Sequence, residues 1–350
     1  KRGLIAFGLL IVAAMFLMSA ADAAPVWAEV YSLIQPDGTF VDAKIWGDEF
    51  YQVVESLDGY TLVRDPDTGV ICYAELSRDG KQLLSTGLTV GDAGKRGPGV
   101  PQHLRITPEA ASQQAMAARA RFIQRQDVAK AARRSDPPQK GNVKALCIIV
   151  DFPDEAGTIP PADVDALCNE VGYSANGNNG SVRDYFYDVS NGLLTYTNYV
   201  PSAYYTALHN KSYYDNPSEE NGPKAAELIG EALQSMESAG FDFSQYDANH
   251  DGYVDGVNCL YVGYTHSGWS RGLWPHSGIM AYEVDGVVVL QYQITEMGND
   301  LTLGTFCHEN GHMICRWPDL YDYDYDSRGA GRYCLMASGG HGTNPVEPCA

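Results

Sequence analysis

Positive charge is scarce in this chain of 350 residues: 24 Lys and Arg stand against 44 Asp and Glu, for a formal net charge of -20 at pH 7. Nucleic acids and anionic membrane surfaces attract proteins through cationic side chains. The composition therefore argues against both as partners. Hydrophobic residues make up 45% of the chain, enough for sizeable cores, and the length allows two domains.

Long hydrophobic runs are absent after the first residues. The apolar stretch 4–18 follows the basic pair Lys1-Arg2 and precedes the small-residue triplet Ala21-Asp22-Ala23. This order is typical of a bacterial secretory signal peptide, and the stretch is shorter than the roughly 20 residues of a membrane span. We therefore expect residues 1–23 to be a cleaved signal peptide. The mature protein is then secreted, to the extracellular space or the periplasm, and has no membrane span.

The eight cysteines lack the paired spacing of zinc fingers, which argues against a structural cysteine–zinc site. Export permits disulfides, but their connectivity cannot be deduced from the sequence. A continuous helix would hold Cys307 and Cys315 about 12 Å apart, whereas a disulfide requires Cα atoms within roughly 7 Å. A bond between Cys315 and Cys334 is one pairing to consider.

The most informative residues are His308, Glu309 and His312, which form the pattern His-Glu-x-x-His. Positions i and i+4 lie on one face of a helix, so both imidazoles can reach one Zn²⁺ at about 2.0–2.1 Å. Glu309 points toward the same site and can act as general base on the attacking water. Two histidines on a surface helix would show this pattern by chance. The flanking residues are apolar, however, and indicate a buried helix whose histidines need partners.

An acid-rich segment and a methionine follow this motif. The acids, which are candidates for a third ligand, are Asp319, Asp322, Asp324 and Asp326. The run 333–340 is rich in small residues and predicts a turn around Met336, which would form a packed floor beneath the metal without binding it. A His-Glu-x-x-His helix, a downstream ligand and a methionine turn together make the metzincin-like pattern of zinc peptidases.

These motifs resemble those of the immune inhibitor A family of secreted bacterial metallopeptidases. That family has HExGH, then Pro-Asp-x-Tyr-Asp, then a methionine turn. The matching residues are His308, Glu309, Gly311 and His312, then Pro318 to Asp322, then Leu335-Met336. Segments 144–154, 181–192 and 273–276 also fit, so the resemblance covers roughly residues 25–350. It implies a zinc peptidase with Asp319 as the third ligand.

Two features depart from the family pattern. The spacing from His312 to Asp319 is one residue longer, and Cys315 stands where the family has a helix-ending glycine. Glycine would turn the chain at positive φ without steric cost. We expect the helix to run one residue further and to turn at residues 316–318, where Pro318 disfavours helix at its predecessor. Asp322 stays the reserve ligand.

Turn signals and composition predict an α+β chain of several parts. Residues 24–100 alternate apolar and polar residues between Asp-Gly turns, which indicates a β-hairpin meander. Residues 101–141 indicate a helix and an open linker with a candidate processing site at Arg133-Arg134. Residues 142–350 have apolar runs at 144–150, 257–264 and 286–294 and helical patterns near 181–188, 223–238 and 301–315.

The resemblance gives these parts a role. It implies that the β-rich region is a propeptide, which would cover the active cleft until it is cut. Residues 142–350 would form a catalytic domain with a twisted mixed sheet and an active-site helix, and this domain would continue beyond residue 350. Cys72 could supply an inhibitory thiolate to the metal, but its apolar neighbours favour a buried strand.

A second metal site is a candidate in the acidic segment 247–255. Oxygen ligands at calcium-loop spacing would come from Asp247, Asn249, Asp251, Tyr253 and Asp255. Position twelve is Asn258 instead of Glu and an apolar strand follows, so the segment is not an EF-hand. The alternative is an Asp- and Asn-rich turn that enters a strand.

We expect a secreted zinc metalloendopeptidase that acts on proteins or peptides, with Glu309 as general base. Two other functions are open: a secreted calcium-binding or adhesion protein with a degenerate zinc site, and a zinc hydrolase of non-peptide amides or esters. The tyrosines considered for stabilising an oxyanion are Tyr321, Tyr323, Tyr325 and Tyr333. His276 and His341 could lie near the cleft, although a core position and a flexible glycine loop are the simpler interpretations.

Overall fold

A computed structural model describes residues 26–92, 97–132, 140–322, 327, 329–340 and 342–349, apart from the side chains of 122–132. Several predictions fall outside the described residues: the signal peptide 1–23, the pair Arg133-Arg134, and residues Asp324, Asp326, Tyr323, Tyr325 and His341.

The first part of the chain forms an antiparallel sheet whose strands pair in chain order. Its strands are β1 (Val26–Ile34), β2 (Phe40–Gly47), β3 (Gln52–Ser56), β4 (Thr61–Arg64), β5 (Ile71–Leu76) and β6 (Leu83–Thr89). Turn glycines such as Gly38 and Gly59 have φ of 84° and 89°, which glycine adopts without strain. The predicted meander of hairpins is confirmed.

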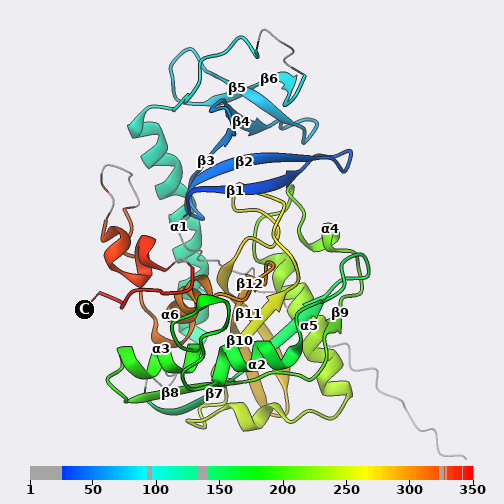
Figure 1. The fold of residues 1–350 in the computed structure, drawn as a ribbon, viewed down its shortest axis with the longest axis vertical. Helices are drawn as coiled ribbons and strands as arrows, with labels where there is room; N and C mark the ends of the chain where they lie inside the picture. Colours follow the sequence, from blue (N-terminus) through cyan, green and yellow to red (C-terminus); the bar gives the residue numbers. More distant parts are fainter. Residues whose placement is uncertain are drawn as a thin grey trace, which may run out of the picture.

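The second part is a mixed sheet surrounded by helices (Figure 1). It is reached through α1 (Pro108–Ala132), whose first turn packs against the N-terminal part of the chain through Ala110 and Ala111. The elements that follow are β7 (Gly141–Asp151), α2 (Pro161–Asn169), α3 (Val182–Val189), β8 (Leu194–Tyr199), β9 (Tyr205–Thr206), α4 (Lys211–Tyr214), α5 (Pro223–Ser238), β10 (Val257–Tyr261), β11 (His276–Val284), β12 (Val287–Glu296) and α6 (Gly304–Cys315). Short helical turns lie at η2 (Ala175–Gly177), η3 (Phe243–Tyr246), η4 (Gly331–Tyr333) and η5 (Leu335–Gly339).

The strand order of the second sheet is β11-β12-β10-β7-β8, with β9 beside β7. Strands β7, β8, β10 and β12 are parallel, and β11 is antiparallel to β12. The predicted strands at 144–150, 257–264 and 286–294 correspond to β7, β10 and β12. The predicted helices near 181–188, 223–238 and 301–315 correspond to α3, α5 and α6. The α+β class is confirmed.

Helices α5 and α6 cover opposite faces of this sheet. Successive residues of a strand point to opposite faces, and β12 shows both. The Tyr292 hydroxyl donates a hydrogen bond to the Gly222 carbonyl at the start of α5. The next residue, Gln293, bonds to Asn258, which in turn bonds to Asn310 of α6. The face of the sheet under α6 is therefore the one that positions the candidate metal ligands.

The two sheets are joined by a loop of the second part, residues 263–275. The carboxylate of buried Asp215 accepts hydrogen bonds from this loop: from the Thr265 and Ser267 hydroxyls and from the backbone N–H groups of His266 and Leu273. The loop, held in this conformation by Asp215, packs against the N-terminal sheet. Ile34 N–H donates to the His266 carbonyl at 3.0 Å.

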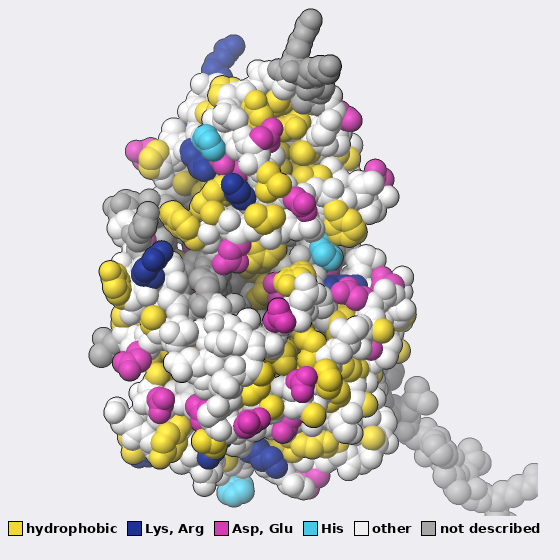
Figure 2. Space-filling model, in the orientation of Figure 1, with side chains coloured by type: hydrophobic (Ala, Val, Ile, Leu, Met, Phe, Trp, Pro, Cys, Tyr) yellow, Lys and Arg dark blue, Asp and Glu magenta, His cyan; other side chains and the backbone are white. Residues whose placement is uncertain are grey.

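The surface of the molecule carries the charge excess seen in the sequence. On the face shown in Figure 2, acidic side chains are spread over the lower part of the molecule, in keeping with the formal net charge of -20. Within the described residues, every helix is too short or too polar to cross a membrane.

Replacing Asp215 by Ala should destabilise the protein by about 3 kcal/mol or more, because it leaves several buried donors without an acceptor. Urea unfolding followed by tryptophan fluorescence measures this. The control is Asp242→Ala, which removes an exposed carboxylate bonded to Ser244 and should shift the midpoint far less. Equal shifts for the two variants would refute the role given to Asp215.

Candidate metal centre

Three predicted ligands meet at one point in the structure. The Nε2 atoms of His308 and His312 lie 3.1 Å apart. The Oδ1 atom of Asp319 lies 3.3 Å from Nε2 of His308 and 3.1 Å from Nε2 of His312. All three residues are buried. Among the described residues, this is the one group of three or more His, Cys, Asp or Glu whose ligand atoms converge so closely, and it could hold a metal ion.

The tautomer of each histidine follows from its second ring nitrogen. Nδ1 of His308 lies 2.8 Å from the Leu335 carbonyl, and Nδ1 of His312 lies 2.7 Å from the Trp317 carbonyl. A carbonyl oxygen only accepts, so each Nδ1 carries a proton and donates it. In the neutral rings, each Nε2 then directs a lone pair at the shared point. Two lone pairs that face each other at 3.1 Å suit a bound cation.

The size of this triangle fits zinc. Ligands held tetrahedrally at about 2.0–2.1 Å from Zn²⁺ stand about 3.3–3.4 Å from one another, and the observed separations are 3.1–3.3 Å. Protonation states fit too. Burial lowers the pKa of His308, which keeps its ring neutral.

The end of α6 brings Asp319 to the histidines. The helix runs to Cys315, as predicted, and turns at Arg316, which adopts the left-handed conformation with φ of 59°. The following N–H, that of Trp317, bonds back to the Gly311 carbonyl at 3.1 Å. Leu320 N–H then bonds to the Met336 carbonyl, which holds the loop against the methionine turn. Arg316 thus takes the role of the missing glycine, and the loop places Asp319 opposite both rings.

Gly311 leaves room for the floor of the site. A Cβ atom at this position would lie 2.8 Å from the sulfur of Met336 and 2.8 Å from the ring of Trp317. Real Cβ atoms do not approach so closely, so the methionine turn can pack against α6 only where the helix has no side chain. Met336 is buried and packs against the helix at Gly311, between the two histidines, and its place beneath a metal stays a prediction.

Asn310 ties α6 to the sheet through a buried network that the sequence did not reveal. Its Oδ1 accepts from the Tyr196 hydroxyl at 2.7 Å, and its Nδ2 donates to Asn258 Oδ1 at 2.8 Å. Asn258 in turn donates to Asn198 Oδ1 at 2.7 Å and accepts from Gln293 at 2.9 Å. These partners come from β8, β10 and β12. The network fixes the helix residue that stands between Glu309 and Gly311.

The remaining residues near the motif have separate positions. Glu309 is fully buried on α6 beside the ligands. Asp322, the reserve ligand, lies outside the converging group, and its carboxylate accepts from Ser327 N–H. Tyr321 is buried and donates to Glu49, whereas Tyr333 is 84% exposed.

The N-terminal sheet reaches this region through the turn between β2 and β3. The Glu49 carboxylate accepts from the Tyr321 hydroxyl at 2.6 Å, two residues beyond Asp319. Phe50 packs against the core of the second part. Cys72 lies in β5, in the core of the N-terminal sheet, and is not part of the converging group.

The acidic loop 247–255 shapes its own backbone. Asp247 accepts from the N–H groups of Asp251 and Gly252, Asp251 accepts from Tyr253 N–H, and Asp255 accepts from Ala248 N–H. Its three carboxylates do not converge as the ligand atoms of His308, His312 and Asp319 do. These hydrogen bonds are those of an Asp- and Asn-rich turn that enters a strand, and calcium binding stays a prediction.

His276 is a core residue. Its Nδ1 lies 2.6 Å from the Trp274 carbonyl and its Nε2 lies 3.0 Å from the Tyr292 hydroxyl. Burial lowers the pKa of His276 to about 4, so the ring stays neutral.

Neither a protein-family model nor a curated protein matches this chain. The geometry of the residues themselves therefore carries the argument for function.

Gly311→Ala should destabilise the protein by about 1–2 kcal/mol through overpacking and should weaken zinc binding, because Trp317 holds His312. The matched control is Gly230→Ala in α5, where the new Cβ would stay 4.0 Å from its nearest neighbour, Met280. That change should stabilise by about 0.5–1 kcal/mol, the usual gain of Ala over Gly in a helix. Thermal unfolding with and without zinc distinguishes them, and a stabilising Gly311→Ala would contradict this packing.

Cys334 should form a disulfide with Cys349 in oxidised protein, which differs from the partner Cys315 considered above. The Cys349 N–H donates to the Cys334 sulfur at 3.0 Å, and the two thiols are themselves in hydrogen-bond contact. Peptide mapping by mass spectrometry without reduction tests this. Recovery of a linked Cys315–Cys334 peptide would show the expectation from the structure to be wrong.

Proposed function

We propose that this chain is a secreted zinc-dependent metalloendopeptidase of the immune inhibitor A type, with a metzincin-like catalytic part. The observation that carries the proposal is the buried convergence of His308, His312 and Asp319 at separations that fit tetrahedral zinc. Zinc held there would polarise the scissile carbonyl and acidify the attacking water.

The protein residues have distinct tasks in this proposal. His308 and His312 bind through Nε2 while Leu335 and Trp317 fix their rings through Nδ1. Glu309 follows His308 directly on the same buried helix, and its carboxylate takes a proton from the attacking water and later passes it to the leaving amine. Met336 and Gly311 form the packed floor.

We also propose that the N-terminal sheet is a propeptide. Two observations support this. Its β2–β3 turn contacts Tyr321 on the ligand-bearing loop, and β1 lines the cavity beside the start of α6. A cover so placed would restrict access to the site until the connection between the two parts is cut and the N-terminal sheet dissociates.

Zinc geometry does not distinguish a peptidase from a hydrolase of other amides or esters, so the experiment must include substrates of both kinds. An adhesion or calcium-binding protein with a degenerate site is less well supported, because the three ligand atoms lie within bonding reach of one ion.

Glu309→Gln should keep the fold and a single bound zinc but lower kcat for casein by about a hundredfold or more, since it removes the general base. The assay uses residues 24–350 after brief trypsin treatment, which can cut at Arg133 or Arg134, followed by a trypsin inhibitor and dilution until the N-terminal sheet has dissociated. Glu237→Gln, an equivalent change at an exposed position of α5, serves as control and should keep full activity. Zinc is measured by elemental analysis.

The outcomes are distinguishable. Chelator-sensitive casein cleavage that Glu309→Gln abolishes supports the peptidase. Undiminished cleavage by zinc-loaded Glu309→Gln would remove Glu309 from its role. Zinc-loaded protein that hydrolyses esters and leaves every peptide intact would favour the non-peptide hydrolase, and failure to bind zinc would overturn the proposal.

A further inference from the structure

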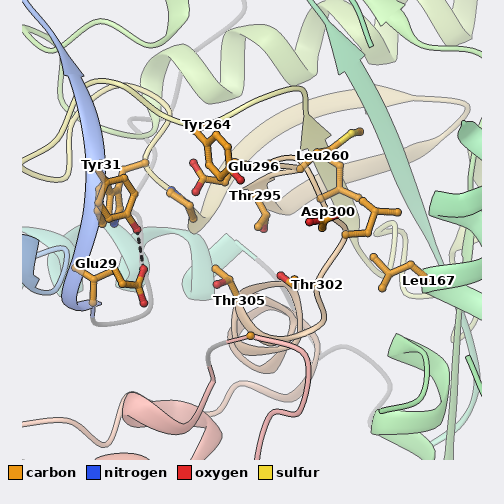
Figure 3. A pocket seen from close by; sticks show the side chains of 17 residues that line it. Glu29, Tyr31, Leu167, Leu260, Tyr264, Thr295, Glu296, Asp300, Thr302 and Thr305 are labelled. Atoms are coloured by element: carbon orange, nitrogen blue, oxygen red, sulfur yellow. Dashed lines mark hydrogen bonds between the residues drawn. The ribbon is translucent and has the colours of Figure 1, made fainter. Parts of the chain in front are cut away.

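A cavity of about 320 Å³ lies between β1, the end of β12 and the start of α6. Figure 3 shows Glu29 and Tyr31 of β1 on one side of it, and below it Thr302, just before α6, and Thr305, in the first turn of α6. Its volume is at the small end of the range of roughly 300–1,000 Å³ for ligand pockets. It can take one long side chain but not a folded partner.

The cavity adjoins the catalytic face of α6. Thr305 lines it and stands four residues before Glu309. Residues i and i+4 share one face of a helix, about one turn apart. A group in the cavity is therefore next to the position where Glu309 would act. The opposite wall includes Thr295, whose hydroxyl donates to Gln293 of the network that holds α6.

The charge of the cavity is one-sided. Glu296 and Asp300 line it from the β12 side and Glu29 from β1, while Lys, Arg and His are absent from its described lining. The Glu296 carboxylate accepts from Thr265 N–H at 2.6 Å, so its position is fixed. Lys211, the cation that acts on Glu296 from a distance, is itself engaged by Glu155 at 3.0 Å and the Val262 carbonyl at 2.7 Å.

The setting of Glu296 disfavours a negative charge that has no cation beside it. Burial raises the pKa of Glu296 to about 7, and nearby Asp215 acts in the same direction. A cation that entered the cavity would stabilise the charged form of this carboxylate. The threonine hydroxyls of residues 295, 302 and 305 add hydrogen-bond acceptors for an ammonium or guanidinium group.

We propose that this cavity is a specificity subsite that receives a Lys or Arg side chain of the peptide substrate next to the scissile bond. The inference rests on the proposed peptidase function. Glu296 and Asp300 belong to the catalytic part and remain after the N-terminal sheet is removed, whereas Glu29 and Tyr31 of β1 form a wall that leaves with it.

The test is cleavage-site profiling of a peptide library by zinc-loaded, trypsin-cut and inhibitor-treated protein of residues 24–350, diluted until the N-terminal sheet has dissociated. We expect one position beside the cleaved bond to favour Lys and Arg by about tenfold or more in kcat/KM over Glu, as fits a charge pair held partly out of water. Asp300→Asn and Glu296→Gln should each lower cleavage of the basic substrate severalfold and leave a neutral substrate unchanged. Glu237→Gln, on α5, should change neither.

Asp300→Lys tests whether reduced cleavage by the other variants reflects misfolding instead of lost charge. Asp300 is exposed at the cavity rim, and reversing its charge should raise cleavage of the matched substrate with Glu at that position while lowering cleavage of the Lys substrate. Peptide cleavage without any basic preference, or a preference that Asp300→Lys leaves intact, overturns the subsite and leaves the peptidase standing. Absence of any peptide cleavage by zinc-loaded protein overturns the proposed function itself.

Discussion

A polar group buried in a protein must be hydrogen-bonded, and α6 carries several such groups in a row. His308, Asn310 and His312 are all buried, and each bonds to a different neighbour: Leu335, the sheet and Trp317. The bonds that satisfy Nδ1 of each histidine also turn Nε2 toward Asp319. The requirement that stabilises the helix in the core is therefore the same one that aims the ligands.

The amide network around Asn310 prevents α6 from rotating or sliding on the sheet. Asn258 of β10 pairs in register with Gln293 of β12, so their side chains are neighbours on the face under α6. If the helix rotated or slid, the hydrogen bond to Asn258 would break and buried amides would lose their partners. Each unsatisfied group costs about 1–3 kcal/mol. Such networks specify a single position when every member is paired. Two ligands and a base on one helix need that fixed position.

The sequence predicted what depends on local spacing. Hairpins followed from Asp-Gly turns, α5 and α6 from apolar periodicity, and the ligand pair from the i, i+4 rule. It did not reveal β11, β8 or the partners of Asn310, because these depend on pairing between residues far apart in the chain. Asn310 looked like a spacer between Glu309 and Gly311. The role of Gly311 was equally hidden, since the Met336 sulfur that fills the space beside it comes from a later loop.

Trp274 belongs to the second part of the chain but lies in the hydrophobic core of the N-terminal sheet. It is 1% exposed, and its ring lies 5.2 Å from that of Tyr31. Arg64 adds a hydrogen bond to Ser267 and a cation–π contact with Trp269. A cut between the sheets would leave these contacts in place, so scission and dissociation are separate events. The second is a bimolecular equilibrium, and dilution, not proteolysis, would set how much of the cut chain has lost its N-terminal sheet.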